Sequence, residues 1–156
     1  MINKYLLTAS TATAETELTS FDKALLLSRI GNYNLVKVSS ILPAKAKEAD
    51  HPTCVEGSVL FTAFAQISSN EAGKSLSAAV AVGIPKDNDQ VGVIMEFSCY
   101  GRKDYAEKMV SKMVKEAMCN RNAEIGEILI KSSSVEVDDS RNYFTAFAAV
   151  AMWEGE

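Results

Sequence analysis

Apolar positions recur at helical spacing in one long segment of the chain, residues 103–119. They return every four residues in two neighbouring rows, which are Tyr105, Met109, Met113 and Ala117, and Ala106, Val110, Val114 and Met118. This spacing predicts an amphipathic helix. A shorter helix is predicted over 19–31, because Ser20 suits the N-cap, Asp22 falls in the first turn and Gly31 suits the position after the last turn.

Most of the remaining chain favours strands separated by turns. Strands are predicted at 2–13, 33–40, 57–68, 75–85, 90–98, 125–137 and 142–152. The runs "SAAVAV" and "TAFAAVAM" are apolar at consecutive positions, which is typical of strands covered on both faces. The polar segment 44–56 contains Pro52 and predicts an exposed loop. Two helices and several strands in 156 residues predict one domain, 1–156, folded as an α/β sandwich.

Composition excludes several classes of protein. The net charge is -4, and the 16 basic and 20 acidic side chains are intermixed, so the basic stripe typical of nucleic-acid-binding proteins is absent. No apolar run reaches the about 20 residues needed to span a bilayer, and the N-terminus lacks the apolar core of a signal peptide. The three widely spaced cysteines fit free thiols in a reducing compartment, which predicts a cytoplasmic protein.

Common catalytic and cofactor motifs are missing from the sequence. His51 is the only histidine, so a Ser–His–acid triad or a zinc site has few candidate members, and no metal site is predicted. No glycine-rich segment matches the phosphate-binding fingerprints of nucleotide-binding folds. An enzyme with this sequence must obtain its reactive group in another way.

The adjacent serines Ser39 and Ser40, in "GNYNLVKVSSILPAK", offer one such way. The hydroxyl of the second serine can attack the carbonyl of the first, and elimination from the resulting ester splits the chain and leaves a pyruvoyl group. The reaction needs a hydrogen-bond donor at the scissile carbonyl and a rigid turn. Asn34 is a candidate donor, because a regular strand places residues 34 and 40 on one face, and Pro43 stiffens the exit. An ordinary turn is the alternative interpretation of a serine pair.

A pyruvoyl-dependent decarboxylase also needs a proton donor, and Glu96 is the candidate. An acid in apolar surroundings has a raised pKa, which suits it to return a proton near neutral pH. In "VGVIMEFS" the odd-numbered residues are apolar, and Glu96 shares the opposite face with Gly92, Ile94 and Ser98. The alternative is a glutamate on an edge strand that faces water.

Three segments together resemble the pyruvoyl-dependent arginine decarboxylases. They are "FDKALLLSRIGNYNLVKVSSILP", "AVAVGIPKD" and "GVIMEF", whose order and spacing match that family, as does the terminal "AFAAVAMW". The loop 44–56 and both termini match poorly. The resemblance implies a four-layer αββα sandwich, assembled as a homotrimer with active sites between protomers. It also implies cleavage between Ser39 and Ser40 into a β chain, 1–39, and an α chain, 40–156, and conversion of L-arginine to agmatine and carbon dioxide.

The resemblance also implies a catalytic role for each of four residues. Ser40 becomes the covalent pyruvoyl cofactor, and Ser39 lines the site as a new C-terminus. Asn34 assists cleavage or holds the substrate near the carbonyl. Glu96 returns the proton after decarboxylation.

Four further residues are implied to bind the substrate. Asp22 would accept the guanidinium group, which a carboxylate can hold through two hydrogen bonds. In the first turn of a helix, Asp22 would also stabilise the helix dipole. Leu25, Gly31 and Tyr33 would line the pocket, although a core or turn position explains each of them equally well. Tyr33 departs from the family, whose other members carry a smaller residue there, so a narrower pocket or an altered substrate preference is expected.

Two other functions stay open at this point. The same chemistry could act on another amino acid, which comparing turnover of arginine, ornithine and lysine would reveal. Alternatively, the chain could be an uncleaved, non-catalytic trimeric binding protein, in which the bond between Ser39 and Ser40 stays intact.

Overall fold

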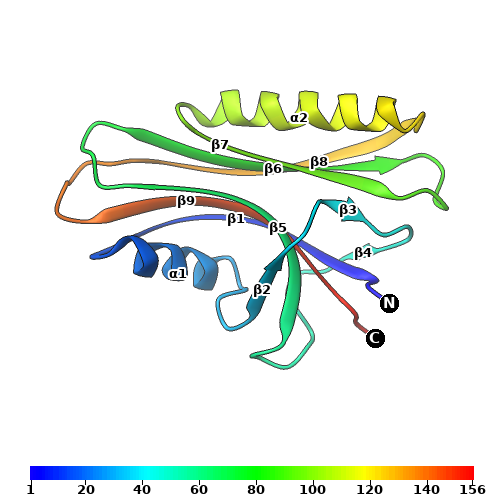
Figure 1. Ribbon diagram of the computed structural model, residues 1–156, viewed down its shortest axis with the longest axis horizontal. Coiled ribbons are helices and arrows are strands. Elements are labelled where there is room, and N and C mark those ends of the chain that lie inside the picture. The colour runs from blue at the N-terminus through cyan, green and yellow to red at the C-terminus, as the bar shows by residue number, and fades with distance from the viewer.

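The computed structural model describes residues 1–156 and stacks two sheets between two helices (Figure 1). Helix α1 (Glu17–Leu27) covers the outer face of a five-stranded sheet, and helix α2 (Lys103–Asn120) covers the outer face of a four-stranded sheet. The inner faces of the two sheets pack on each other. The two helices and two sheets of the predicted sandwich are therefore confirmed. Neither helix is long and apolar enough to cross a membrane.

The five-stranded sheet has the order β2-β5-β9-β1-β4. Its central strand β9 runs antiparallel to both of its long neighbours, β5 and β1, whereas the short β2 is parallel to β5 and the short β4 is parallel to β1. The strands are β1 (Lys4–Ala14), β2 (Asn34–Lys37), β4 (Lys47–Glu48), β5 (Val59–Ser69) and β9 (Tyr143–Trp153). Short strands therefore form both edges of this sheet.

The four-stranded sheet has the order β3-β7-β6-β8 and is antiparallel throughout. Its strands are β3 (Ile41–Leu42), β6 (Ser75–Pro85), β7 (Gly92–Tyr100) and β8 (Ile125–Glu136). Because β3 pairs with β7 only at Gly92 and Val93, most of β7 forms an edge of the sheet.

The alanine-rich strands β6 and β9 each contribute residues to two hydrophobic clusters, one on either face of the strand. Strands β6 and β9 are buried along nearly their whole length, which confirms that the two apolar runs are covered on both faces. Alternate residues of β9 serve different layers, since Ala146 and Ala148 lie between the sheets while Phe147 and Ala149 pack under α1. The alanines at three of these positions let neighbouring layers approach closely, and Phe147 fills the space under α1.

The start of α1 differs from the prediction. Thr16 is the N-cap and forms a capping box with Thr19, so Ser20 is not the cap. Ser20 lies inside the helix and is buried, with its hydroxyl 2.7 Å from that of Thr145. The two threonines satisfy backbone groups of the first turn, and the serine instead joins the helix to the sheet.

The end of α1 also differs from the prediction. The helix ends at Leu27, and Arg29 (φ 65°), rather than Gly31, has the left-handed backbone that follows it. A Cβ on Gly31 would lie only 2.6 Å from the Leu26 nitrogen. The close return of the chain onto α1, and not helix termination, therefore explains this glycine.

The strand predicted over 33–40 is too long. Strand β2 covers only Asn34–Lys37, and the chain then leaves that sheet and joins the other one as β3. The hydrophobic pattern does not reveal this change of sheet, because both pieces are short and extended and follow each other closely in the sequence. The segment 44–56 is largely irregular, as predicted, apart from the short β4.

Gly83 of β6 allows α2 to approach its sheet, so Gly83→Ala is expected to destabilise the protein. An added Cβ would lie 2.6 Å from Val114 Cγ1 on α2. Overpacking of this kind costs about 1–3 kcal/mol, which urea unfolding would measure. Gly101→Ala is the control, because its Cβ would meet only Cys99, at 3.6 Å. Equal unfolding midpoints for the two variants would show that α2 moves away at no cost.

Candidate active site

The chain crosses from one sheet to the other at Ser39 and Ser40. Before the crossing, Val38 donates its N–H to the Thr62 carbonyl of β5 at 3.3 Å. At its end, the Ser40 carbonyl accepts the Ile94 N–H of β7 at 2.9 Å. Figure 1 shows β2 and β3 on either side of this crossing. The peptide bond between the serines is therefore a short bridge between two fixed layers.

Ser40 has a backbone conformation that is unusual for a residue with a side chain. Its φ is 82°, in the left-handed region that favours glycine. Ser40 is buried, whereas Ser39 is exposed. Neither the carbonyl of Ser39 nor the N–H of Ser40 has a backbone hydrogen-bond partner. The peptide bond predicted to be cleaved therefore joins the Ser39 carbonyl, which has no backbone partner, to the strained Ser40.

Glu96 reaches the serine pair from β7. Its side chain lies on the strand face that Ile94 directs between the sheets, whereas Met95 and Phe97 pack under α2, as the predicted alternation requires. The Ser40 hydroxyl donates to Glu96 Oε2 at 3.1 Å and lies 3.4 Å from Oε1. Glu96 is half-buried on an edge strand, so its position combines features of both environments considered from the sequence.

Opposing influences set the proton affinity of Glu96. Burial raises the pKa of its carboxyl group, while the hydrogen bond from Ser40 and the positive charge of Lys37 lower it, and the net direction is upward. A carboxyl group with a raised pKa exchanges a proton near neutral pH more readily than an exposed glutamate. Lys37 is the last residue of β2, and its ammonium lies 4.7 Å from the centre of the Phe64 ring.

Lys37 was not predicted as a neighbour of this site. The only signal for Lys37 in the sequence is its place shortly before the serine pair. The Phe64 ring that its ammonium meets packs with Phe21 and Phe147 under α1, on the face of the sheet away from Glu96.

Asn34 makes its side-chain hydrogen bond away from the serine pair. Its amide donates to the Gly57 carbonyl at 2.8 Å. The prediction that residues 34 and 40 share one strand face is wrong, because β2 ends at Lys37 and the backbone turns at Ser40. Within one chain, the structure therefore gives the Ser39 carbonyl no donor from Asn34.

The residues predicted to bind substrate lie on α1 and on the turn that follows it. Asp22 is exposed in the second turn of α1, so the prediction that it lies in the first turn is wrong, because the helix begins at Glu17. Leu25 packs into the apolar cluster between α1 and its sheet. The Tyr33 hydroxyl donates to the Cys54 carbonyl at 3.3 Å, and burial raises the pKa of this hydroxyl. Gly31 and Tyr33 line a cavity of about 230 Å³, together with Leu26, Arg29, Asn32, His51, Pro52 and Glu56.

Two clusters of predicted site residues form within one chain, Ser40 with Glu96 and Gly31 with Tyr33. Asp22 and Asn34 belong to neither cluster, because no hydrogen bond joins them to it and neither of them lines the cavity. Ser40 and Glu96 contact each other at the crossing, and neither lines the cavity that contains Gly31 and Tyr33. A substrate that touched both clusters would need them to be brought together.

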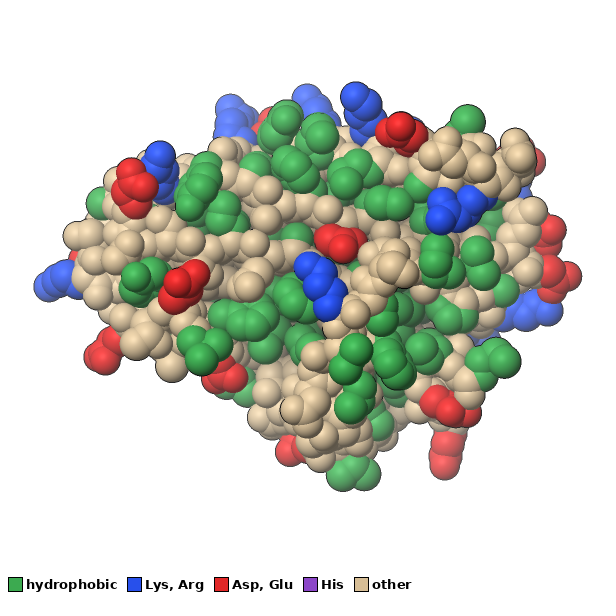
Figure 2. All heavy atoms as spheres, viewed as in Figure 1, with side chains coloured by type: hydrophobic (Ala, Val, Ile, Leu, Met, Phe, Trp, Pro, Cys, Tyr) green, Lys and Arg blue, Asp and Glu red, His purple; other side chains and the backbone are tan.

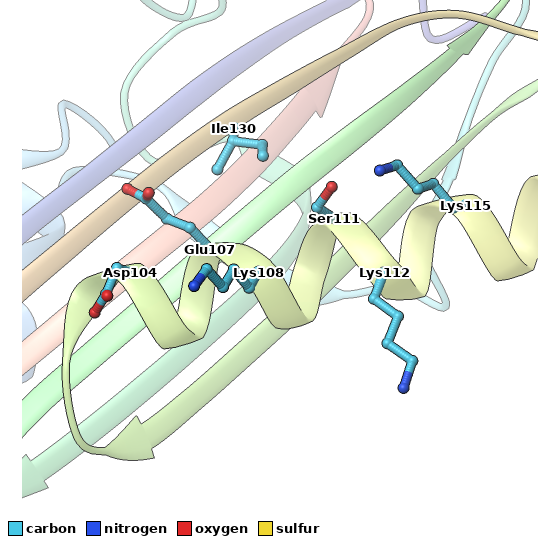
Figure 3. A pocket seen from close by; sticks show the side chains of 7 residues that line it. All are labelled: Asp104, Glu107, Lys108, Ser111, Lys112, Lys115 and Ile130. Atoms are coloured by element: carbon cyan, nitrogen blue, oxygen red, sulfur yellow. The ribbon is translucent and has the colours of Figure 1, made fainter.

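A larger cavity, of about 530 Å³, lies along α2 and involves neither cluster. Figure 3 shows Glu107, Ser111 and Lys115 on the same side of α2 as Ile130, while Lys112 points away. The residues that line this cavity are mostly charged, and none of them is predicted from the sequence to take part in cleavage, catalysis or substrate binding.

Comparison with known proteins identifies the family. Residues 4–156 match the family described as pyruvoyl-dependent arginine decarboxylase. The chain belongs to the pyruvoyl-dependent arginine decarboxylase family. A protein of that name from Methanococcus vannielii is 40% identical over 151 residues, which cover 97% of this chain and 90% of the relative. One from Thermococcus kodakarensis is 44% identical over 147 residues, which cover 93% of this chain and 91% of the relative.

The solved structure of a pyruvoyl-dependent histidine decarboxylase at pH 8 has a similar fold. It aligns with a TM-score of 0.52 and 16% identity, over 69% of this chain and 55% of that one. At this identity the likeness concerns the fold alone. Membership of the arginine decarboxylase family makes this chain a decarboxylase that depends on a covalent pyruvoyl group. A buried, strained Ser40 whose hydroxyl contacts Glu96 fits the formation of that group.

The conformation of Ser40 predicts an order of stability for two variants. Ser40→Gly and Ser40→Ala both lack the hydroxyl, but only glycine adopts a positive φ without strain. Ser40→Gly is therefore expected to be more stable than Ser40→Ala by about 1 kcal/mol in urea unfolding. A more stable alanine variant would mean that the crossing leaves the left-handed region once the hydroxyl is gone.

Proposed function

We propose that this chain cleaves itself between Ser39 and Ser40 and then converts L-arginine to agmatine and carbon dioxide. The observation that carries the proposal is the contact between the Ser40 hydroxyl and Glu96 at a strained crossing. The relatives named arginine decarboxylases support arginine as the substrate. We also propose a cytoplasmic location, because three cysteines without disulfides suit a reducing compartment.

Cleavage begins when Glu96 takes the proton of the Ser40 hydroxyl and the oxygen attacks the Ser39 carbonyl carbon. The C–N bond then breaks, the nitrogen of residue 40 takes up a proton, and an ester joins Ser39 to the side chain of residue 40. Removal of the Cα proton of residue 40 expels Ser39 as a carboxylate. Water then replaces the nitrogen, which leaves as ammonia. The 3.1 Å contact between the hydroxyl and Glu96 Oε2 supports the first of these steps.

Both new chain ends would stay in place after cleavage. The β chain, 1–39, ends beside β2, which is paired with β5. The α chain, 40–156, begins beside β3, which is paired with β7. Because each end is fixed to a different sheet, the cut requires no rearrangement of the core.

The residues of the mature site would divide the work of decarboxylation. The pyruvoyl group supplies an electron-withdrawing carbonyl that takes up the electron pair released when carbon dioxide leaves. Glu96, whose pKa is raised by burial, holds a proton beside residue 40 and delivers it to the α-carbon of the product. Asp22 binds the guanidinium group through two charge-assisted hydrogen bonds.

We propose that the complete site forms between protomers of a homotrimer. Within one chain the substrate-binding residues on α1 and its following turn lie apart from Ser40 and Glu96, so a neighbour would bring the two clusters together. Apolar side chains near the crossing, including Val36 and Ile41, are exposed and would be covered by the neighbour. Asn34, on the same short strand, would enter the site across this interface. Figure 2 shows apolar side chains exposed around the centre of one face of the molecule.

Denaturing mass spectrometry and the release of labelled carbon dioxide test the proposal together. We expect two chains that break between Ser39 and Ser40, with a pyruvoyl mass at the start of the larger one. We also expect carbon dioxide from carboxyl-labelled arginine, and neither result with Ser40→Ala. An intact wild-type chain without carbon dioxide release would favour a non-catalytic binding protein. Faster release of carbon dioxide from ornithine or lysine would replace arginine as the proposed substrate, and the proposed decarboxylation would stand.

Asp22→Asn is expected to lower kcat/KM for arginine about tenfold to a hundredfold, because a hydrogen bond to a charged group contributes about 1.5–3 kcal/mol. Steady-state kinetics would measure this loss, and the extent of self-cleavage should match the parent. Glu17→Gln is the control, since Glu17 is the acidic residue in the first turn of the same helix, where it stabilises the dipole, whereas Asp22 lies in the second turn. The same loss in both variants would mean that acidic charge on α1, and not recognition of the guanidinium group by Asp22, explains the effect.

A further inference from the structure

The Ser39 carbonyl lacks a hydrogen-bond donor at the point where self-cleavage would place negative charge. Its oxygen takes part in no backbone hydrogen bond, and the Asn34 amide donates to the Gly57 carbonyl instead. When the Ser40 oxygen bonds to the Ser39 carbonyl carbon, one electron pair of the C=O bond moves onto the carbonyl oxygen. A donor aimed at such a developing charge is usually the largest single contribution to a reaction of this type. The fold must supply that donor from another element.

Strand β7 has backbone groups that point toward the crossing. At one end of its ladder with β6, the Gly101 N–H donates to the Ser75 carbonyl, so the odd-numbered residues of β7 face β6. In an antiparallel pair the backbone groups of alternate residues point to opposite sides of the strand. The even-numbered residues of β7 therefore face β3. The bond from the Ile94 N–H to the Ser40 carbonyl, at 2.9 Å, confirms this direction.

The Glu96 N–H is the next group along this edge of β7. Its orientation matches that of Ile94, because the two residues are two positions apart in a ladder without a register shift. Strand β3 pairs with β7 only at Gly92 and Val93, so no strand lies opposite Glu96, and no hydrogen bond outside the ladders uses its N–H. The Glu96 carboxylate accepts the Ser40 hydroxyl at 3.1 Å. A free donor therefore belongs to the residue that also contacts the nucleophile.

The backbone of Ser40 turns the Ser39 carbonyl toward β7. In a regular antiparallel pair Ser40 would also donate its own N–H to Ile94, but this second bond is missing. The φ of 82° at Ser40 differs by roughly 140° from that of an antiparallel strand, which swings the N–H away from β7. Across a trans peptide bond the N–H and C=O groups point in opposite directions. The Ser39 carbonyl thus swings toward β7 as the Ser40 N–H swings away.

We propose that the backbone N–H of Glu96 is the oxyanion donor of self-cleavage, an inference that rests on the proposed cut between Ser39 and Ser40. The Glu96 carboxylate takes the Ser40 proton, the Ser40 oxygen bonds to the Ser39 carbon, and the Glu96 N–H holds the resulting oxyanion. The oxyanion then restores its C=O bond, the C–N bond breaks, and the nitrogen of residue 40 takes the proton from Glu96. One residue of β7 therefore supplies both the base and the oxyanion donor.

The first experiment replaces the Glu96 N–H by an oxygen atom. Cell-free translation with a suppressor tRNA that carries the α-hydroxy analogue of glutamate makes the full chain with an ester bond before residue 96, and it keeps the side chain. Self-cleavage of the newly made chain is followed on denaturing gels. Cleavage is expected to be about a hundredfold to a thousandfold slower, the usual effect of removing one oxyanion donor. Cleavage at the parent rate would overturn the proposal.

The same ester placed before Ser98 is the matched control. The Ser98 N–H points to the same open edge of β7 and also has no strand opposite it, but it is two residues further from the crossing. This variant loses the same kind of group and carries the same ester bond, so it should cleave at the parent rate. Equal slowing in both variants would assign the effect to the stability of β7 and would contradict the proposal.

The second experiment tests whether the Glu96 N–H is free, without depending on any reaction. NMR would measure amide hydrogen exchange residue by residue in Ser40→Ala, which stays uncleaved. Glu96 and Ser98 should exchange rapidly, whereas Met95 and Phe97, which face β6, should be protected. Equal protection of Glu96 and Met95 would show that the Glu96 N–H already has a partner, and the proposal would fail. A wild-type chain that never cleaved would overturn the proposed function as well, whereas parent-rate cleavage of the ester variant would overturn this inference alone.

Discussion

The structure depends on one constraint, which is that the chain must pass from the edge of one sheet to the edge of the other across two serines. Strand β2 is fixed to β5 and strand β3 is fixed to β7, so the backbone between them cannot spread the turn over more residues. The left-handed backbone of Ser40 accompanies this short crossing, and the same residue directs its hydroxyl to Glu96. Strain of this kind persists only where the surrounding structure holds it in place.

The alanine-rich strands that form the core also determine the electrostatics of the site. Small apolar residues bring the two sheets together, and they leave the strands around β7 without charged side chains. A carboxyl group in that environment keeps its proton more firmly than one in water. Packing and chemistry are thus linked, because a more polar core would lower the pKa of Glu96 as well as loosen the layers.

Sequence periodicity predicted those features that are set by residues close together in the chain. The long helix follows from its four-residue apolar repeat, and the alternation along β7 correctly placed Glu96 on the same face as Ile94, although it did not decide whether that face is buried. The crossing was not predicted, because the change of sheet after Lys37 is decided by β5 and β7, which are distant in sequence. The suggested alignment of Asn34 with Ser40 failed for the same reason.

Motif resemblance predicted the family, which periodicity alone would not have revealed. It pointed to the serine pair and to Glu96, and the fold places Ser40 in contact with Glu96. It contained no information on the left-handed backbone of Ser40, because that conformation is a property of the folded arrangement and not of a local motif.

The hydrogen bond between Ser40 and Glu96 exists only in the uncleaved chain. On the proposed chemistry, cleavage consumes the hydroxyl that donates it, and one of the two influences that lower the Glu96 pKa disappears with it. The carboxyl group then holds its proton more firmly than before, so the base of the first reaction becomes a better acid for the second. The change is permanent, because the hydroxyl is not restored after cleavage. Glu96 is therefore tuned for self-cleavage before the cut and for turnover after it.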